Sequence, residues 1–148
     1  MEPSTLIPPE RVLPDSSASS KRALLTELAN SLSTMDPDQV LEVVMKREHL
    51  GSTGIGHGVA IPHGRIPDLN HPVIGLVRHP AGIEFESIDS KPVHIVIILL
   101  VPDNEDRTHL ELLAKLARAL QQEAFRNAIM HAATPGAISE LFMETNLQ

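Results

Sequence analysis

Residues 93–101 read Val-His-Ile-Val-Ile-Ile-Leu-Leu-Val, and this stretch decides the fold. Its residues are mostly β-branched, and only His94 is polar. Such a run is typical of a central strand that is covered on both faces, because a strand with one face in water alternates apolar and polar residues. A strand buried in this way requires helices above and below the sheet. The stretch therefore predicts a layered α/β domain.

Helical patterns lie on both sides of this strand. Before it, apolar residues at helical spacing follow Lys21, and Asp36-Pro37 has the capping residue and first-turn proline that begin a helix. After it, Thr108 to Glu111 forms a capping box, and an apolar face follows as far as Leu120. The predicted helices begin near residues 21, 37, 108, 123 and 135, and a further strand is predicted over residues 73–77.

The chain has 148 residues, the length of one domain. Residues 1–20 carry four prolines and five serines, which is typical of a flexible, exposed arm. Within it, Arg11-Val12-Leu13 has the composition of a possible edge strand. We therefore expect an N-terminal arm over residues 1–20 and one domain over residues 21–148.

The composition excludes several function classes. The chain has 12 Lys and Arg and 19 Asp and Glu, which gives a net charge of -7. It has three Phe and no Trp or Tyr. An acidic chain with few rings to stack on bases is not expected to bind nucleic acid. There is no cysteine for disulfides or thiolate metal sites. No apolar stretch is long enough for a membrane span and no secretory signal is visible, so we expect a cytoplasmic protein without direct membrane insertion.

A glycine-rich stretch is the obvious place for chemistry. Residues 51–65 read Gly-Ser-Thr-Gly-Ile-Gly-His-Gly-Val-Ala-Ile-Pro-His-Gly-Arg, and five glycines predict a loop with unusual backbone angles or close approach to a ligand. The P-loop pattern fails because His57-Gly58 stands where Lys and Ser or Thr are needed. The dinucleotide fingerprint fails because, counted from Gly54 and Gly56, the position of its third glycine holds Val59. The serine-hydrolase and zincin motifs are absent as well.

Histidine is the reactive residue type that remains, and His63 is the first candidate among the eight histidines. Pro62 fixes its own φ and favours an extended Ile61, while Gly64 lets the chain turn sharply afterwards. The imidazole is then presented on a stiff mount, which suits a nucleophile whose reacting atom must be held in place. The spacing alone is equally consistent with an ordinary turn histidine after a proline.

Two further side chains are candidates. His109 falls in the first turn of its predicted helix, where the helix dipole disfavours imidazolium and free amides favour an oxyanion. A solvated first-turn residue is the alternative. Arg47 precedes the glycine stretch and has the planar fork that matches phosphate oxygens. Alone, it is also explained as a helix-end charge that pairs with Glu48 or with the terminal carbonyls.

Together these residues resemble a known family. Residues 47–64, Arg-Glu-His-Leu-Gly-Ser-Thr-Gly-Ile-Gly-His-Gly-Val-Ala-Ile-Pro-His-Gly, look like the signature of the enzyme IIA domains of the phosphoenolpyruvate-dependent phosphotransferase system. The likeness is to the fructose/mannitol type, and most closely to the nitrogen-regulatory branch. It continues through Leu100-Val101-Pro102 and Thr108-His109-Leu110, and covers about Lys21 to Phe142.

The resemblance implies a single-domain α/β sandwich, with a mixed central β-sheet flanked by helices on both faces. It implies that His63 is the phosphorylated residue, that His109 is the second active-site histidine, and that Arg47 contacts the phosphoryl group. The phosphoryl-binding loop would comprise Ser52, Thr53, Gly54 and Gly64. No metal and no cofactor is implied.

The implied function is that of a phosphotransferase component. A histidine-containing phosphocarrier protein would donate the phosphoryl group to His63, and a downstream regulatory or transport protein would be the next partner. Two alternatives within this family stay open: a sugar-specific IIA component for fructose or mannitol, and a regulatory module that acts mainly by binding its partners. A histidine-rich metal protein is a third alternative, although no histidine has another three or four residues away to share a helical face.

Overall fold

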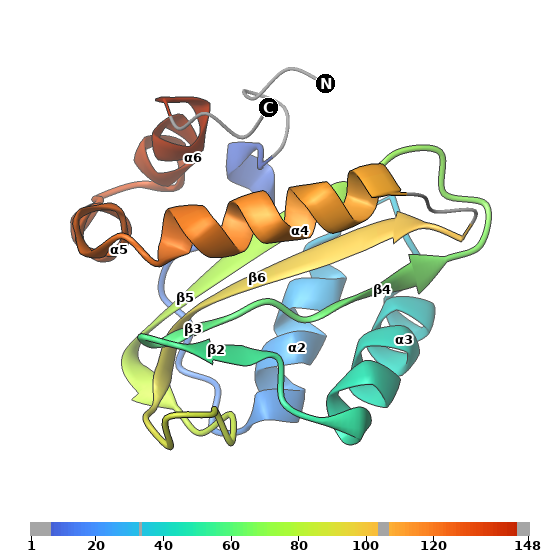
Figure 1. The fold of residues 1–148 in the computed structure, drawn as a ribbon, viewed down its shortest axis with the longest axis horizontal. Coiled ribbons are helices and arrows are strands. Elements are labelled where there is room, and N and C mark those ends of the chain that lie inside the picture. The colour runs from blue at the N-terminus through green and yellow to red at the C-terminus, as the bar shows by residue number, and fades with distance from the viewer. Residues whose placement is uncertain (1–6, 33, 104–106, 145–148) are drawn as a thin grey trace.

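The strand predicted over residues 93–101 is β6 (Val93–Pro102), and it lies at the centre of the sheet (Figure 1). A computed structural model describes residues 7–32, 34–103 and 107–144, except for the side chains of residues 107–109 and 144. In these residues the sheet has six strands in the order β1-β5-β6-β3-β2, with β4 also paired to β6. The other strands are β1 (Val12–Leu13), β2 (Gly54–Gly56), β3 (Val59–Ala60), β4 (His63–Ile66) and β5 (Val73–Ile83).

The sheet is mixed, as expected. β6 pairs antiparallel with β5 on one side and parallel with β3 and β4 on the other. β3 and β4 follow one another along the same edge of β6, and the offset between register partners is the same in both. Pro62 lies at the break between them and has no N–H to donate to the ladder, although its carbonyl accepts from Leu99 N at 2.9 Å. β3 and β4 are thus one strand interrupted by a proline.

Helices cover both faces of the sheet (Figure 1). On one face are α2 (Lys21–Asn30) and α3 (Pro37–Leu50), and on the other are α4 (Arg107–Leu120), α5 (Glu123–His131) and α6 (Pro135–Glu144). Their positions confirm the predicted helices. The side chain of Asp36 accepts from Asp38 N and caps α3, as its place before Pro37 predicts.

The two faces of β6 supply two hydrophobic cores. Ile95, Ile97 and Leu99 pack with residues of α4, α5 and α6. Val96, Ile98 and Leu100 pack with residues of α2 and α3. Because successive side chains of a strand point to opposite faces, an uninterrupted apolar run is needed to fill both cores. This is the physical reason why residues 93–101 predicted the fold.

Residues 7–20 lie against the domain. Ile7 is 1% exposed within the core, and its carbonyl accepts from Ser139 Oγ. Pro9–Arg11 forms the short 3-10 helix η1, and Val12–Leu13 forms β1 at the edge of the sheet, parallel to β5. The division of the chain into an arm and a domain stays a prediction.

The structure corrects the loop predicted for residues 51–65. Most of this stretch forms the short strands β2, β3 and β4, and the chain does not turn after Gly64 but continues as β4 to Ile66. The tight turn lies earlier, between β2 and β3, where both His57 and Gly58 have positive φ angles of 59° and 77°. Two central residues with positive φ are what a hairpin turn requires to match the twist of its strands.

Candidate functional site

His63 is the first residue of β4 and the register partner of Leu99 in β6. Partners in a parallel pair point to the same face, and Leu99 belongs to the core beneath α4. The half-buried imidazole therefore faces the side of the sheet that α4 covers, next to an edge that β4 leaves unpaired in the described residues. The site is thus placed by the sheet and not by a loop.

The tautomer of His63 follows from its hydrogen bond. Nδ1 lies 2.8 Å from the carbonyl oxygen of Ile61. A carbonyl oxygen only accepts, so Nδ1 must carry the proton and donate it. In the neutral ring Nε2 then holds an unshared electron pair, and within the described residues it has no hydrogen-bond partner. This is the form in which an imidazole acts as a nucleophile.

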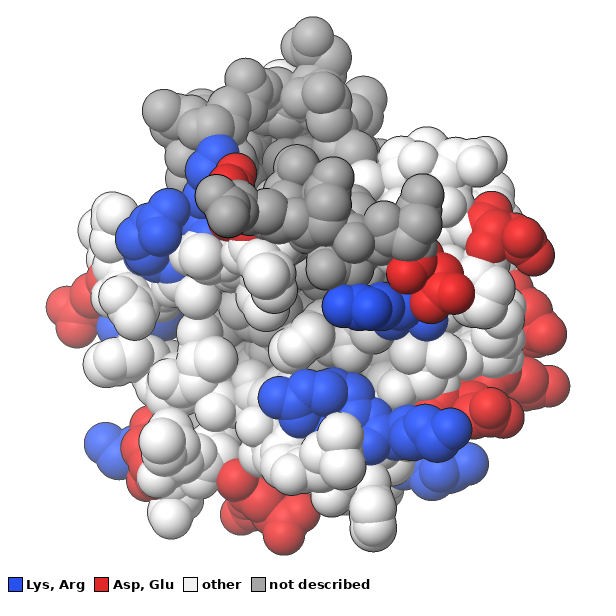
Figure 2. All heavy atoms as spheres, turned by 45° about the vertical axis from the view of Figure 1, so that its right-hand side comes forward, with Lys and Arg blue, Asp and Glu red and all other residues white. Residues whose placement is uncertain are grey.

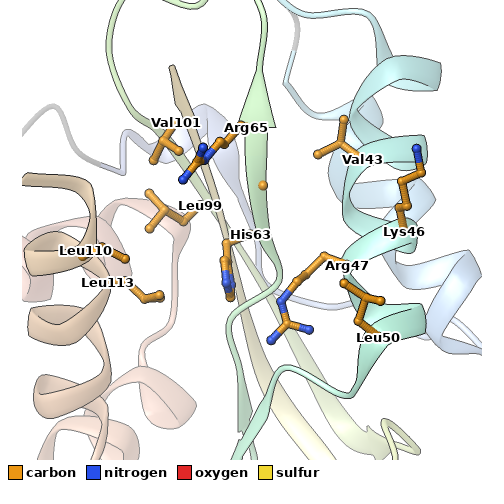
Figure 3. A pocket seen from close by; sticks show the side chains of 11 residues that line it. Val43, Lys46, Arg47, Leu50, His63, Arg65, Leu99, Val101, Leu110 and Leu113 are labelled. Atoms are coloured by element: carbon orange, nitrogen blue, oxygen red, sulfur yellow. The ribbon is translucent and has the colours of Figure 1, made fainter. Parts of the chain in front are cut away.

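The His63 ring points into a cavity of about 430 Å³ between α3 and α4 (Figure 3). Its floor is Leu99 and Val101 of β6, and Leu110 and Leu113 of α4 form one wall. The opposite wall is a single face of α3, comprising Val43, Lys46, Arg47 and Leu50. His63, Gly64 and Arg65 of β4 lie between the two walls. Residues from two helices on opposite faces of the sheet thus line the cavity beside His63.

Arg47 lines the same cavity as His63 (Figure 3), and its contact with a phosphoryl group stays a prediction. Its Nη1 donates to the carbonyl oxygen of Gly51 at 2.8 Å, just beyond the end of α3. The guanidinium therefore also bonds a carbonyl at the end of its helix, which is one of the two alternatives that the sequence allowed for Arg47. Glu48 is not its partner, because the carboxylate of Glu48 bonds Lys21 and Thr53 instead. The bond to Gly51 orients the guanidinium and leaves its other N–H groups for a ligand.

The charge around His63 favours an anion. Lys46, Arg47 and Arg65 line the cavity, and its described lining contains no Asp or Glu, although the whole chain carries a net charge of -7. Figure 2 is turned toward the end of the molecule where α3 and β4 lie. It shows several Lys and Arg side chains near the middle of this face, with Asp and Glu mostly toward its margins. Cations held at the rim of an apolar cavity attract and stabilise negative charge.

His109 lies in the first turn of α4, as predicted. Its side chain is outside the described part of the structure. Leu110 and Leu113, which follow it in the same helix, line the cavity, so the N-terminal end of α4 borders the site. The catalytic role of His109 stays a prediction.

The four residues of the predicted phosphoryl-binding loop separate into two groups. Gly64 lines the cavity, whereas Ser52, Thr53 and Gly54 are not among its described lining residues. Ser52 Oγ donates to Phe85 O at 2.7 Å and accepts from Gly54 N at 3.0 Å. The amide and the hydroxyl of Thr53 both bond the carboxylate of Glu48. These groups hold their own segment in place, and their contact with a phosphoryl group stays a prediction.

Sequence reasoning missed Lys46, Arg65 and the apolar walls. A signal for the first two was present. Residues 43, 46, 47 and 50 have the spacing of one helical face, and residues 63 and 65 share one face of a strand. The wall from α4 had no such signal, because its approach to β4 is set by the packing of the whole sheet.

In the described residues no group of three His, Asp or Glu side chains is placed to hold a metal ion. The described part of the chain also has no helix that is both long and apolar enough to span a membrane.

The fold and this site define a class of protein, and comparison with known families identifies it. The family model for the phosphoenolpyruvate-dependent sugar phosphotransferase system, EIIA 2, matches residues 5–145. The chain belongs to this family.

Among curated proteins, the chain is similar to nitrogen regulatory proteins. It is 42% identical to that of Bradyrhizobium diazoefficiens over 122 residues, which cover 80% of this chain and 79% of the relative. It is 32% identical to that of Pseudomonas aeruginosa over 143 residues, which cover 94% and 93%. Among solved structures, the nitrogen regulatory protein IIA-Ntr from Neisseria meningitidis has a TM-score of 0.89 and 34% identity, covering 94% of this chain and 97% of that one. The mannitol IIA protein of Escherichia coli, at 22% identity, 90% and 96% coverage and a TM-score of 0.75, shares the fold.

Proposed function

We propose that this protein is a cytoplasmic phosphohistidine carrier in which His63 accepts a phosphoryl group from a histidine-containing phosphocarrier protein. The observation that carries the proposal is the hydrogen bond from Nδ1 of His63 to Ile61 O, which in the neutral ring leaves the electron pair on Nε2, at a cavity that Lys46 and Arg47 also line. Membership of the EIIA 2 family, whose members are phosphotransfer components, supports the proposal.

The proposed reaction is an in-line transfer between two imidazoles. The electron pair on Nε2 of His63 attacks the phosphorus of the donor's phosphohistidine. A new N–P bond forms, the N–P bond to the donor breaks, and the donor imidazole keeps that electron pair. Bond types are the same before and after, so the transfer is nearly balanced in free energy. Its rate then depends on positioning and on stabilising charge on the phosphoryl oxygens.

The residues around His63 have distinct roles in this proposal. Arg47, oriented by Gly51, contacts the phosphoryl oxygens, and Lys46 and Arg65 lower the cost of bringing an anion into the cavity. His109, at the start of α4, is the second active-site histidine. The first turn of a helix presents free amides and a positive dipole end, which also favour the transferred group.

The regulatory role is the finer part of the proposal. Curated relatives with 32–42% identity over most of this chain are named nitrogen regulatory proteins, and we infer the same kind of role here, with a downstream regulatory protein as partner. The alternative is a sugar-specific component. It is favoured by 32% identity over 118 residues to the fructose-specific EIIABC component of Bacillus subtilis, although the match covers only 19% of that protein. The two are separated by identifying which protein receives the phosphoryl group.

Phosphorylation is tested with purified components. The protein is mixed with phosphoenolpyruvate, enzyme I and the histidine phosphocarrier, and its intact mass is measured before and after acid or base treatment. We expect one phosphoryl group that is labile in acid and stable in base, present in the control variant His71→Ala and absent in His63→Ala. Equal phosphorylation of His63→Ala would refute the proposal. Partners retained by His63→Ala in a pull-down would indicate a role by binding alone.

A further inference from the structure

A buried carboxylate lies behind the site and has no part in the reaction just described. The side chain of Glu48, the residue after Arg47 in α3, is 2% exposed. Its Oε2 accepts from Lys21 Nζ at 2.9 Å. Its Oε1 accepts from Thr53 N at 3.1 Å and from the hydroxyl of Thr53. A buried carboxylate with this many donors holds them in a defined position.

Hydrogen bonds connect this carboxylate with His63 in a short series. Glu48 holds Thr53 by its amide and its hydroxyl. The carbonyl of Thr53 accepts from Ile61 N at 3.1 Å, and the carbonyl of Ile61 accepts from His63 Nδ1 at 2.8 Å. Thr53 is 5% exposed and Ile61 is 1% exposed, so water does not replace these bonds at low cost. Thr53, held by Glu48, thus supports the acceptor for His63 from one side, while the pairing of Ala60 and Pro62 with β6 supports it from the other.

Lys21 completes the arrangement. Its ammonium group lies 4.7 Å from the centroid of the Phe85 ring and bonds Glu48 directly. It comes from the first residue of α2, so the first turn of α2, the last turn of α3 and the segment before β2 meet at this ion pair. The pair balances the charge of Glu48 without exposing it to water.

We propose that Glu48, neutralised by Lys21, is a positioning residue that keeps His63 in the tautomer with Nδ1 protonated. The proposal rests on the proposed function of His63. Without the bonds from Glu48, Thr53 and then the Ile61 carbonyl shift, and the hydrogen bond to Nδ1 lengthens beyond its useful range. The proton then distributes between Nδ1 and Nε2. The fraction of His63 with a free electron pair on Nε2 falls, and so does the rate of transfer.

Two double variants isolate the hydrogen bonds from the buried charge. Lys21→Met/Glu48→Gln removes both charges but keeps an amide oxygen that accepts from Thr53. Lys21→Met/Glu48→Leu removes the charges and the acceptor together. Both replace the ion pair with uncharged side chains of similar size. The Leu variant also leaves the buried amide and hydroxyl of Thr53 unpaired, so a control for lost stability is needed. Leu28→Ala, in the core beneath α2, serves as a destabilised control with the hydrogen-bond series intact.

The tautomer is measured by the 15N chemical shifts of the imidazole, and the transfer rate in single turnover from the phosphorylated donor. We expect the Gln variant and Leu28→Ala to keep the Nδ1-protonated tautomer and a rate near that of the unaltered protein. The Leu variant should show mixed tautomers and a rate that falls with the fraction of the Nδ1-protonated form, roughly twofold to tenfold. Equal behaviour of the two double variants, whether both keep the tautomer or both lose it, would overturn the proposal.

The tautomer readout does not require that His63 be phosphorylated. If His63→Ala still accepts the phosphoryl group while the two double variants differ in tautomer, the proposed function fails and the structural effect of Glu48 stands. If phosphorylation at His63 is found and the double variants agree, only the role of Glu48 fails.

Discussion

Gly64 of β4 packs directly against the side chain of Val43 in α3. A Cβ atom at Gly64 would overlap the side chain of Val43, and the two residues line the same cavity as His63 and Arg47. We predict that Gly64→Ala destabilises the protein by roughly 1–3 kcal/mol through overpacking, measured by urea unfolding. It should also lower the transfer rate, because α3 carries Arg47.

Removing the obstacle tests this explanation. In Val43→Ala/Gly64→Ala the new methyl group has room, so the double variant should be more stable than the sum of the two single changes predicts. Strict additivity of the two changes would show that the contact does not limit the approach of β4 to α3.

Arg47→Ala should reduce transfer without unfolding the protein. Its described hydrogen bond goes to the carbonyl of Gly51, at the exposed end of α3, so we expect a loss of stability below about 1 kcal/mol. Loss of a charged donor at the phosphoryl oxygens should slow single-turnover transfer about 100-fold. Lys46→Ala is the matched control and should mainly change the salt dependence of the encounter. A rate for Arg47→Ala equal to that of Lys46→Ala would argue against direct contact.

Arg78 is predicted to be essential for stability and dispensable for chemistry. Its guanidinium, buried in β5, donates to the carbonyls of Pro14 at 2.8 Å, Ile129 at 2.8 Å and Ala132 at 2.7 Å. Arg78→Met leaves these acceptors without their donor, which should cost roughly 2–4 kcal/mol in urea unfolding. The exposed Arg22→Met should change stability by less than about 0.5 kcal/mol. A similar small effect for both would contradict the assignment.

Asp89 should contribute to the pH dependence of stability. Hydrogen bonds from the backbone N–H groups of Lys91 and His57 hold the pKa of its carboxyl below the ordinary value. A lowered folded pKa means that the stabilisation is complete above the unfolded pKa, about 3.9 for Asp, and disappears as the pH falls through the folded value. Asp89→Asn should therefore be less stable than the unaltered protein at pH 7 and approach it at acid pH. Urea unfolding across this range, with Glu42→Gln as control, checks the convergence.

Much of the fold was predictable because its signals are local. The apolar run of β6, the periodic faces of the helices and the Asp36-Pro37 start of α3 each depend on neighbours in sequence. The strands of the glycine-rich stretch were not predicted, because they have two to four residues and exist only by pairing with β6 and with each other. Glycine there allows close approach of other parts of the protein, such as Val43 at Gly64 and Ser87 at Gly54.

The candidate site was predictable in part for the same reason. Pro62-His63-Gly64 and Arg47 are recognisable in sequence, and the structure brings His63, Gly64 and Arg47 to one cavity. What Thr53 contacts was not predictable, because Glu48 is turned inward by Lys21, a residue of another helix. Leu110 and Leu113 reach the cavity from the opposite face of the sheet, and no spacing in the sequence encodes that approach.

The group that orients the His63 ring is a main-chain carbonyl two residues earlier. Every amino acid at position 61 has this main-chain oxygen, so no substitution there removes the acceptor as long as β3 and β4 form. Substitutions can change the orientation of the His63 ring only indirectly, through side chains that shift the backbone. Variation that changes the orientation of this ring should therefore accumulate in the residues that support the backbone around it and leave its immediate hydrogen-bond partner unchanged.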